Sequence, residues 1–267
     1  PYNSVTYHIY PRSFKDTNAD GIGDLQGIIE KIDYLSFLGV DAIWLSPIST
    51  SPQKDFGYDI SDFTDIDPIF GNLKKFDELV SKLHKKNMKI LLDYLPNHSS
   101  SQHSWFIESK QDKKNPKRNW YIWKDPKPNG SPPNNWLSVF GGSAWELDKK
   151  TGQFYYHTFH KDQPNLNWEN PEVVREMLNV LKFWLKKGVD GFRIDSIYHM
   201  IRNTKFEDEP INTNYKKKTQ KPYDQLLHIY THALPESIQE LKKMVSVIQN
   251  YPNKFMVSEA YTTYDEL

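Results

Sequence analysis

The feature that most constrains the fold is the alternation of short apolar, β-type runs with amphipathic helical patterns. The apolar runs lie at residues 5–10, 40–46, 88–95, 189–195 and 254–260. Between successive runs the sequence has helical patterns at residues 25–38, 73–84, 173–185 and 235–248. Strands that alternate with helices in this way form a parallel sheet covered by helices. We therefore predict an α/β fold built on parallel strands.

A long polar segment separates the third and fourth predicted strands. Residues 98–169 are rich in Pro, Asn, Gly and Trp, and so long a connection usually has a structure or function of its own. A hairpin pattern at residues 145–157, with Lys-Thr-Gly at its turn, indicates a small inserted subdomain. The predicted strand–helix portions are residues 1–97 and 170–267. A second polar segment, residues 202–223, is expected to be a solvated loop.

The charge balance and the absence of cysteine narrow the classes of partner and chemistry. Lys plus Arg and Asp plus Glu both number 34, and the chain has no Cys. An even balance does not favour nucleic acid or an anionic surface, and thiolate chemistry is excluded. No run of eighteen apolar residues and no signal-peptide pattern occurs, so we expect no membrane span within this sequence. A neutral small molecule is the expected partner.

Ionisable side chains gather where the predicted strands end. They are Asp59, Asp93, His98, Arg193, Asp195 and Glu259. The carboxyl ends of parallel barrel strands and the loops after them form the working face of such a fold. Taken singly, each carboxylate could be a helix cap or a surface charge. A convergence from separate strands predicts a functional site instead.

Two of these carboxylates suit cleavage of a glycosidic bond. Arg193 precedes Asp195 by two residues and shares its face of the strand, so the guanidinium can hold Asp195 ionised. Glu259 follows an apolar strand, and a neighbouring carboxylate favours its protonated form. Retaining glycoside hydrolysis requires one ionised and one protonated carboxyl group, about 5–5.5 Å apart.

Four motifs carry a resemblance to a known family. Residues 93–98 (Asp-Tyr-Leu-Pro-Asn-His), 191–195 (Gly-Phe-Arg-Ile-Asp) and 258–260 (Ser-Glu-Ala) resemble the first three conserved regions of the α-amylase superfamily. Residues 163–167 (Gln-Pro-Asn-Leu-Asn) resemble a further signature of oligo-1,6-glucosidases and insect maltases, with Asn165 where relatives usually have Asp. The resemblance implies a (β/α)8 TIM barrel, of which this sequence contains strands 1–5 with a B subdomain inserted after strand 3.

The same resemblance implies roles for individual residues. Asp195 would be the nucleophile and Glu259 the general acid/base of a retaining α-glucosidase acting on small oligosaccharides such as maltose or sucrose. The implied sugar contacts are Asp59, Tyr58, His98, Arg193, His103 and Phe140. The family's remaining catalytic Asp would lie beyond Leu267, so we expect a partial chain that is inactive in isolation.

The segment at residues 16–24 (Asp-Thr-Asn-Ala-Asp-Gly-Ile-Gly-Asp) places oxygen-bearing side chains at alternate positions. This spacing is similar to that of an EF-hand loop and suits Ca²⁺. The family resemblance implies a structural Ca²⁺, in some relatives Mg²⁺. Its ligands would be Asp16, Asn18, Asp20, the Ile22 carbonyl and Asp24. The alternative is a polar turn in which Asp24 caps the following helix.

Other functions remain open. A non-catalytic relative, such as the ectodomain of a transporter heavy chain or a receptor-like protein, would be favoured by loss of a catalytic carboxylate, but both are present. A transglucosidase such as a sucrose isomerase would use the same residues and release a rearranged sugar. The similarity to insect maltases suggests a secreted or gut-surface protein.

Overall fold

The computed structural model describes residues 4–260 and divides them into two compact units. The sheet unit comprises residues 4–95, 177–195 and 242–259, and the insertion unit comprises residues 96–176, 196–241 and 260. No helix of this described part of the chain is long and apolar enough to cross a membrane.

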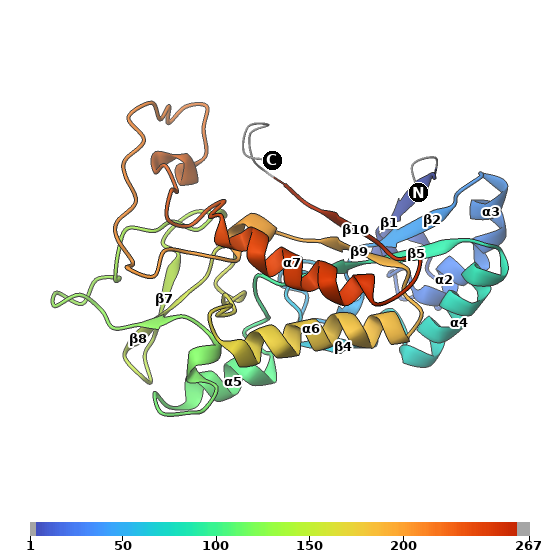
Figure 1. Cartoon of the computed structure of the whole chain (residues 1–267), viewed down its shortest axis with the longest axis horizontal. Coiled ribbons are helices and arrows are strands. Elements are labelled where there is room, and N and C mark those ends of the chain that lie inside the picture. Colours follow the sequence, from blue (N-terminus) through green and yellow to red (C-terminus); the bar gives the residue numbers. More distant parts are fainter. Residues whose placement is uncertain (1–3, 261–267) are drawn as a thin grey trace. The chain divides into compact units, whose positions relative to one another are not determined.

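The sheet unit is built on five parallel strands. They are β1 (Thr6–Ile9), β2 (Ala42–Leu45), β5 (Lys89–Tyr94), β9 (Gly191–Ile194) and β10 (Phe255–Ser258). The strands lie side by side in the order β1-β2-β5-β9-β10, and every neighbouring pair is parallel (Figure 1). Each strand falls within an apolar run of the sequence, so the predicted parallel sheet is confirmed. A small antiparallel pair, β3 (Ser49–Thr50) and β4 (Asp62–Ile66), follows β2.

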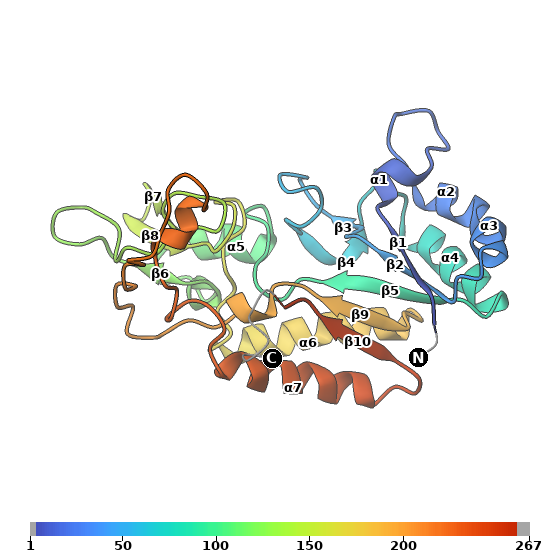
Figure 2. The same cartoon turned by 90° about the horizontal axis from the view of Figure 1, so that it is seen from above.

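The helices form where the apolar spacing predicts them. They are α2 (Leu25–Glu30), α3 (Ile32–Phe37), α4 (Leu73–Lys85), α6 (Pro171–Lys186) and α7 (Glu236–Gln249). Figure 2 shows α2, α3 and α4 beside the strands of the sheet unit. Asn72 caps the start of α4, because its side chain accepts a hydrogen bond from the Lys75 N–H. The helix buries one apolar stripe. Phe76 on that stripe packs edge-to-face against Trp184 of α6, with ring centroids 5.2 Å apart.

The prediction of one continuous helix at residues 25–38 is wrong. The backbone leaves helical geometry at Lys31, which ends α2 and begins α3. The Lys31 N–H bonds to the Ile28 carbonyl three residues back, a tightened turn typical of a helix end. The buried stripe continues through Ile28, Ile32 and Leu35 on both sides of the break. Apolar spacing therefore could not reveal it. A short helix, α1 (Pro11–Phe14), was also not predicted.

The insertion unit has an antiparallel sheet and an aromatic core. Strands β6 (Trp123–Lys124), β8 (Gln153–Tyr156) and β7 (Trp145–Asp148) pair in that order, and the predicted hairpin is confirmed as β7–β8. Helix α5 (Ser104–Gln111) belongs to the same unit. The buried core comprises Ile122, Trp136, Ala144, Trp145, Phe154 and Tyr156.

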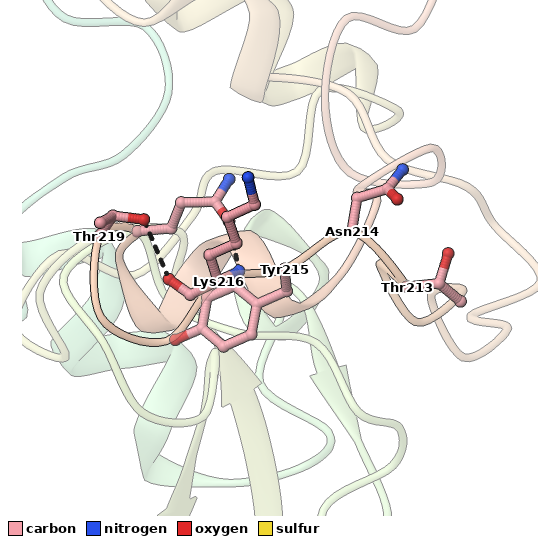
Figure 3. Close-up of a pocket in the computed structure, with 6 residues that line it drawn as sticks. Thr213, Asn214, Tyr215, Lys216 and Thr219 are labelled. Carbon is pink, nitrogen blue, oxygen red and sulfur yellow. Dashed lines mark hydrogen bonds between the residues drawn. The ribbon is translucent and has the colours of Figure 1, made fainter.

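Residues 202–223 are only partly the solvated loop that their polarity predicted. A short 3₁₀ turn, η2 (Ile197–His199), precedes this segment, and another, η3 (Pro222–Gln225), begins at its end. Phe206 stacks on Trp136 with ring centroids 5.4 Å apart, and Glu209 is buried. The expectation is therefore wrong for these residues and right for the lysine-rich tip at 213–221, which is largely exposed. The tip borders an open hollow lined by Thr213, Asn214, Tyr215, Lys216, Thr219 and Gln220 (Figure 3).

Candidate active site

The guanidinium of Arg193 is the centre of the site in the sheet unit. Its Nη1 lies 2.5 Å from Asp195 Oδ1 and 3.3 Å from Asp93 Oδ1, and its Nη2 forms an ion pair with Glu259 Oε1. The carboxylates come from the ends of three neighbouring strands, β5, β9 and β10. The structure therefore brings together four of the side chains that the strand-end argument placed in one site.

The three carboxylates keep Arg193 charged. Burial alone would lower the pKa of Arg193, but Asp195, Asp93 and Glu259 outweigh that effect and raise its pKa. The side chain is 14% exposed, so water screens these interactions little. Arg193 is thus a permanent cation in direct contact with Asp195, and this contact is the one that the two-residue spacing predicted.

Asp93 anchors the guanidinium from the neighbouring strand. Asp93 lies directly across from Arg193 in the β5–β9 register. It also accepts hydrogen bonds from the Tyr58 hydroxyl at 3.0 Å and from Trp44 Nε1 at 3.2 Å. Burial, helped by the Asp195 charge and opposed by Arg193, raises the pKa of Asp93 to about 7. The sequence placed Asp93 at the site but gave it no role, and it did not indicate Trp44.

His8 is a second residue that the sequence argument missed. Its ring stacks on Trp44, with centroids 3.8 Å apart and 15° between the planes, and its Nε2 lies 2.8 Å from Ser46 Oγ. Burial and then the charge of Arg193 lower the pKa of His8, which favours the neutral ring. The Arg193 guanidinium is 5.6 Å from the centre of the Trp44 ring. His8 and Trp44 are neighbours because β1 pairs with β2 in parallel. A prediction of that pairing is the signal that could have revealed both residues.

Tyr58 and Asp59 have different surroundings although they are adjacent in sequence. Tyr58 contacts the Arg193 centre through Asp93, and burial followed by the Asp93 charge raises the pKa of its hydroxyl, which therefore stays protonated. Asp59 is fully buried and accepts hydrogen bonds from Ser51 Oγ, the Lys54 N–H and the Asp55 N–H at 2.9–3.0 Å. Asp59 thus fixes the shape of its own loop. Sugar contacts by these two residues stay predictions.

Three predicted sugar contacts belong to the insertion unit. His98 is buried, with its Nδ1 3.0 Å from Asn97 Nδ2. His103 caps α5, because its Nδ1 accepts a hydrogen bond from the Trp105 N–H at 3.1 Å. Phe140 is 59% exposed, and its ring centroid is 5.5 Å from that of Phe159. The structure gives His103 a clear structural task, and the sugar-binding roles of all three stay predictions.

The loop at residues 16–24 folds around its own polar side chains. Asp16 accepts hydrogen bonds from the Asn18 and Gly21 N–H groups, among others, and these lower the pKa of Asp16, with Gly21 the largest cause. Asp24 Oδ1 accepts from the Gly27 N–H, so Asp24 caps α2 as the alternative reading expected. No three Asp, Glu or His side chains in residues 4–260 already converge as a metal cluster. The oxygen donors are nevertheless the kind that Ca²⁺ uses, and a calcium site in this loop stays a prediction.

A parallel strand–helix sheet with acidic side chains on one guanidinium at its carboxyl edge defines an α/β protein with a carboxylate–guanidinium centre. Residues 8–267 match the family described as alpha amylase, catalytic domain, and the chain belongs to that family. The predicted (β/α)8 barrel class, with strands 1–5 present, is therefore confirmed.

Similar proteins agree with this assignment. The chain is 48% identical over 264 residues to an alpha-glucosidase of Apis mellifera, covering 97% of this chain and 46% of that protein. It is 54% identical over 205 residues to an oligo-1,6-glucosidase of Heyndrickxia coagulans, covering 77% and 37%. A crystal structure of an alpha-glucosyl transfer enzyme matches with a TM-score of 0.93 and 44% identity, covering 97% of this chain and 49% of that one. The chain thus spans about half the length, or less, of these relatives.

Proposed function

We propose that this chain supplies the nucleophile and the general acid/base of a retaining α-glucosidase acting on small oligosaccharides such as maltose or sucrose. Asp195 is the nucleophile and Glu259 the acid/base. The observation that carries the proposal is the shared contact of both carboxylates with the Arg193 guanidinium. The names of the similar alpha-glucosidases support the substrate class. Secretion stays a prediction drawn from the resemblance to insect maltases.

The chemistry divides between the two carboxyl groups. Asp195, ionised beside Arg193, attacks the anomeric carbon while Glu259 gives its proton to the departing glycosidic oxygen. Glu259 then takes a proton from water, whose oxygen displaces Asp195 from the sugar and releases glucose with retained configuration. Arg193 favours the ionised nucleophile before attack, and Asp93 holds Arg193 in place.

Removal of the nucleophile tests the catalytic assignment. In the full-length enzyme that contains this sequence, we expect Asp195→Asn to lower kcat for maltose by roughly 10³-fold or more, because no covalent intermediate can form. Glu108→Gln, a change of similar size on α5, should leave kcat unchanged and serves as the control. Full activity in the Asp195→Asn protein would refute the assignment. An inactive wild-type enzyme would favour the non-catalytic alternative.

Glu259 is tested by the acidity of the leaving group. We expect Glu259→Gln to slow maltose cleavage by roughly 10²–10⁴-fold. Formation of the glycosyl intermediate from an aryl glucoside with an acidic phenol should be slowed far less, because that leaving group needs no proton. Equal losses for both substrates in single-turnover measurements would argue against a proton-donor role.

Transglucosylation is the second candidate function. The structural similarity to an alpha-glucosyl transfer enzyme, with a TM-score of 0.93, supports this second candidate. Both reactions would proceed through the same intermediate on Asp195, and they differ only in whether water or a sugar hydroxyl accepts the glucosyl group. Chromatography of the products from maltose and sucrose distinguishes free glucose from rearranged or lengthened sugars.

We also propose that the loop at residues 16–24 binds a structural Ca²⁺. Asp16, Asn18, Asp20, the Ile22 carbonyl and Asp24 would hold it. Their all-oxygen donor set, with the left-handed Gly21 in the tight turn, supports the proposal. The ion would stabilise the start of α2 and take no part in sugar chemistry.

A further inference from the structure

The side-chain amide of Asn165 can adopt only one orientation. Its Oδ1 lies 2.6 Å from the Thr158 backbone nitrogen, and because a backbone N–H can only donate, that atom must be the oxygen. Asn165 Nδ2 therefore faces the other way and donates to Asn97 Oδ1 at 3.0 Å and to Thr158 Oγ1 at 2.9 Å. Asn165 and Asn97 are 1% exposed and Thr158 is 2% exposed, so solvent cannot readily replace these bonds.

The orientation of the Asn97 side-chain amide follows from the same assignment of donors and acceptors. Its Oδ1 is occupied by Asn165, so its Nδ2 is the atom that lies 3.0 Å from His98 Nδ1. An amide nitrogen only donates, and His98 Nδ1 must therefore be the acceptor. A neutral imidazole that accepts at Nδ1 carries its proton on Nε2. Turning the Asn97 amide over would set two NH₂ groups face to face in a buried place.

We propose that Asn165 is a positioning residue that fixes the tautomer of His98 through Asn97 and makes His98 Nε2 a hydrogen-bond donor. The functional part rests on the proposed α-glucosidase function, in which His98 contacts a sugar hydroxyl. A neutral ring held in one tautomer presents that hydroxyl with a donor of fixed direction. The edge contact of the His98 ring with Phe159, at 5.7 Å between centroids, holds the ring plane.

An aspartate at position 165 would reverse this chain of hydrogen bonds. A carboxylate has no donor, so Asn97 would have to turn its Nδ2 toward residue 165. Asn97 Oδ1 would then face His98 Nδ1, which would have to carry a proton. The identity of residue 165, with no contact to the sugar, would thus select the protonated nitrogen of His98.

The tautomer is measured directly in the protein labelled with ¹⁵N-histidine. Long-range ¹H–¹⁵N correlation spectra distinguish protonated from unprotonated ring nitrogens, and the His98 signals are those missing from His98→Gln. We expect Nε2 to be protonated and Nδ1 unprotonated in the wild-type protein, and Nδ1 to gain a proton in Asn165→Asp. Asn167→Asp is the matched control: Asn167 is similarly buried but donates to Asn119 instead, so the His98 signals should not change.

A proton on His98 Nδ1 in the wild-type protein would overturn the proposal, and so would an unchanged tautomer in a folded Asn165→Asp protein. If Asn165→Asp does not fold, the wild-type spectrum alone decides. In the active enzyme we expect Asn165→Asp to change KM for maltose by about two- to tenfold, the scale of one altered hydrogen bond, with a smaller change in kcat. An enzyme without glucosidase activity would refute the proposed function and leave the tautomer result standing.

Discussion

At the scale of single residues, the site depends on Asp93 more than its sequence position suggested. Asp93 contacts Arg193 and also accepts hydrogen bonds from Tyr58 and Trp44. Its place at a strand end was readable from the sequence. Its partners were not, because Trp44 and Tyr58 come from other parts of the chain and meet Asp93 only after the sheet has formed. Pairings of this kind need the register of the strands.

Replacing Asp93 with asparagine should loosen Arg193 without unfolding the site. The oxygen of the new amide can still accept from Trp44 and its nitrogen can donate to Tyr58, but the anionic anchor is lost. We expect Asp93→Asn to lower kcat/KM of the full-length enzyme by roughly 10–100-fold, because the nucleophile's partner loses its fixed position. Unchanged kinetics would show that Asp195 and Glu259 hold Arg193 by themselves. Asp62→Asn on β4 is a control outside the centre.

The raised pKa of Asp93 predicts the direction in which the free energy of unfolding changes with pH. Its pKa rises from 3.8 to about 7 on folding. Between these two pH values, the Asp93 carboxyl is therefore protonated in the folded protein but ionised in the unfolded chain. The resulting stabilisation is complete below 3.8 and is lost as pH rises through about 7. In Asp93→Asn the free energy of unfolding should therefore fall less between about pH 4 and pH 7 than in the wild-type protein. Urea titrations at both pH values measure this difference, and parallel curves for the two proteins would contradict it.

At the scale of elements, the loop before α2 carries a strained residue. Ala19 has φ 64°, in the left-handed region that disfavours a Cβ. Glycine has no such penalty, so we expect Ala19→Gly to raise the free energy of unfolding by roughly 0.5–1 kcal/mol, the left-handed strain less the added chain entropy. Thermal or urea unfolding measures the change. Ala144→Gly, at a buried position without this backbone geometry, should destabilise instead.

Calcium should act on the same loop. If the ion binds there, adding Ca²⁺ raises the unfolding midpoint and EGTA lowers it, because a ligand of the folded state stabilises that state. Asp20→Ala should remove the response while leaving the EGTA-treated midpoint nearly unchanged. Asp20 suits this test because its side chain accepts hydrogen bonds from within the loop, from Asn18 Nδ2 and the Ile22 N–H. A calcium response that persists in Asp20→Ala would place the ion elsewhere.

At the scale of the whole molecule, the regular elements were largely predictable and the exceptions share one cause. All five predicted strands and three of the four predicted helices are present, and both sets follow from local apolar spacing. The packing of Phe206 on Trp136 and the stacking of His8 on Trp44 depend on partners that are distant in the sequence. Local patterns therefore predicted the fold and the catalytic candidates. They could not predict the contacts that fix the candidates in place.

The described sheet has two edge strands, and this bears on how the chain behaves alone. β1 and β10 each pair with a single neighbour, and Val257 of β10 is 44% exposed. Exposed apolar edge strands promote association between chains. We expect the isolated chain to aggregate, and Val257→Lys to reduce that aggregation in light scattering, because a charge on an edge opposes strand pairing. Ile107→Lys on α5, at a similarly exposed apolar residue, is the control. A monomeric wild-type chain at high concentration would contradict the expectation.

The contact of three carboxylates with one guanidinium has an electrostatic consequence. If all three carboxylates and Arg193 were ionised, their charges would sum to −3 + 1 = −2 elementary charges at the carboxyl edge of the sheet. Because Asp93 titrates near neutrality, a single proton shared within this array would offset half of that excess. The net charge of the centre would then change between −2 and −1 near neutral pH.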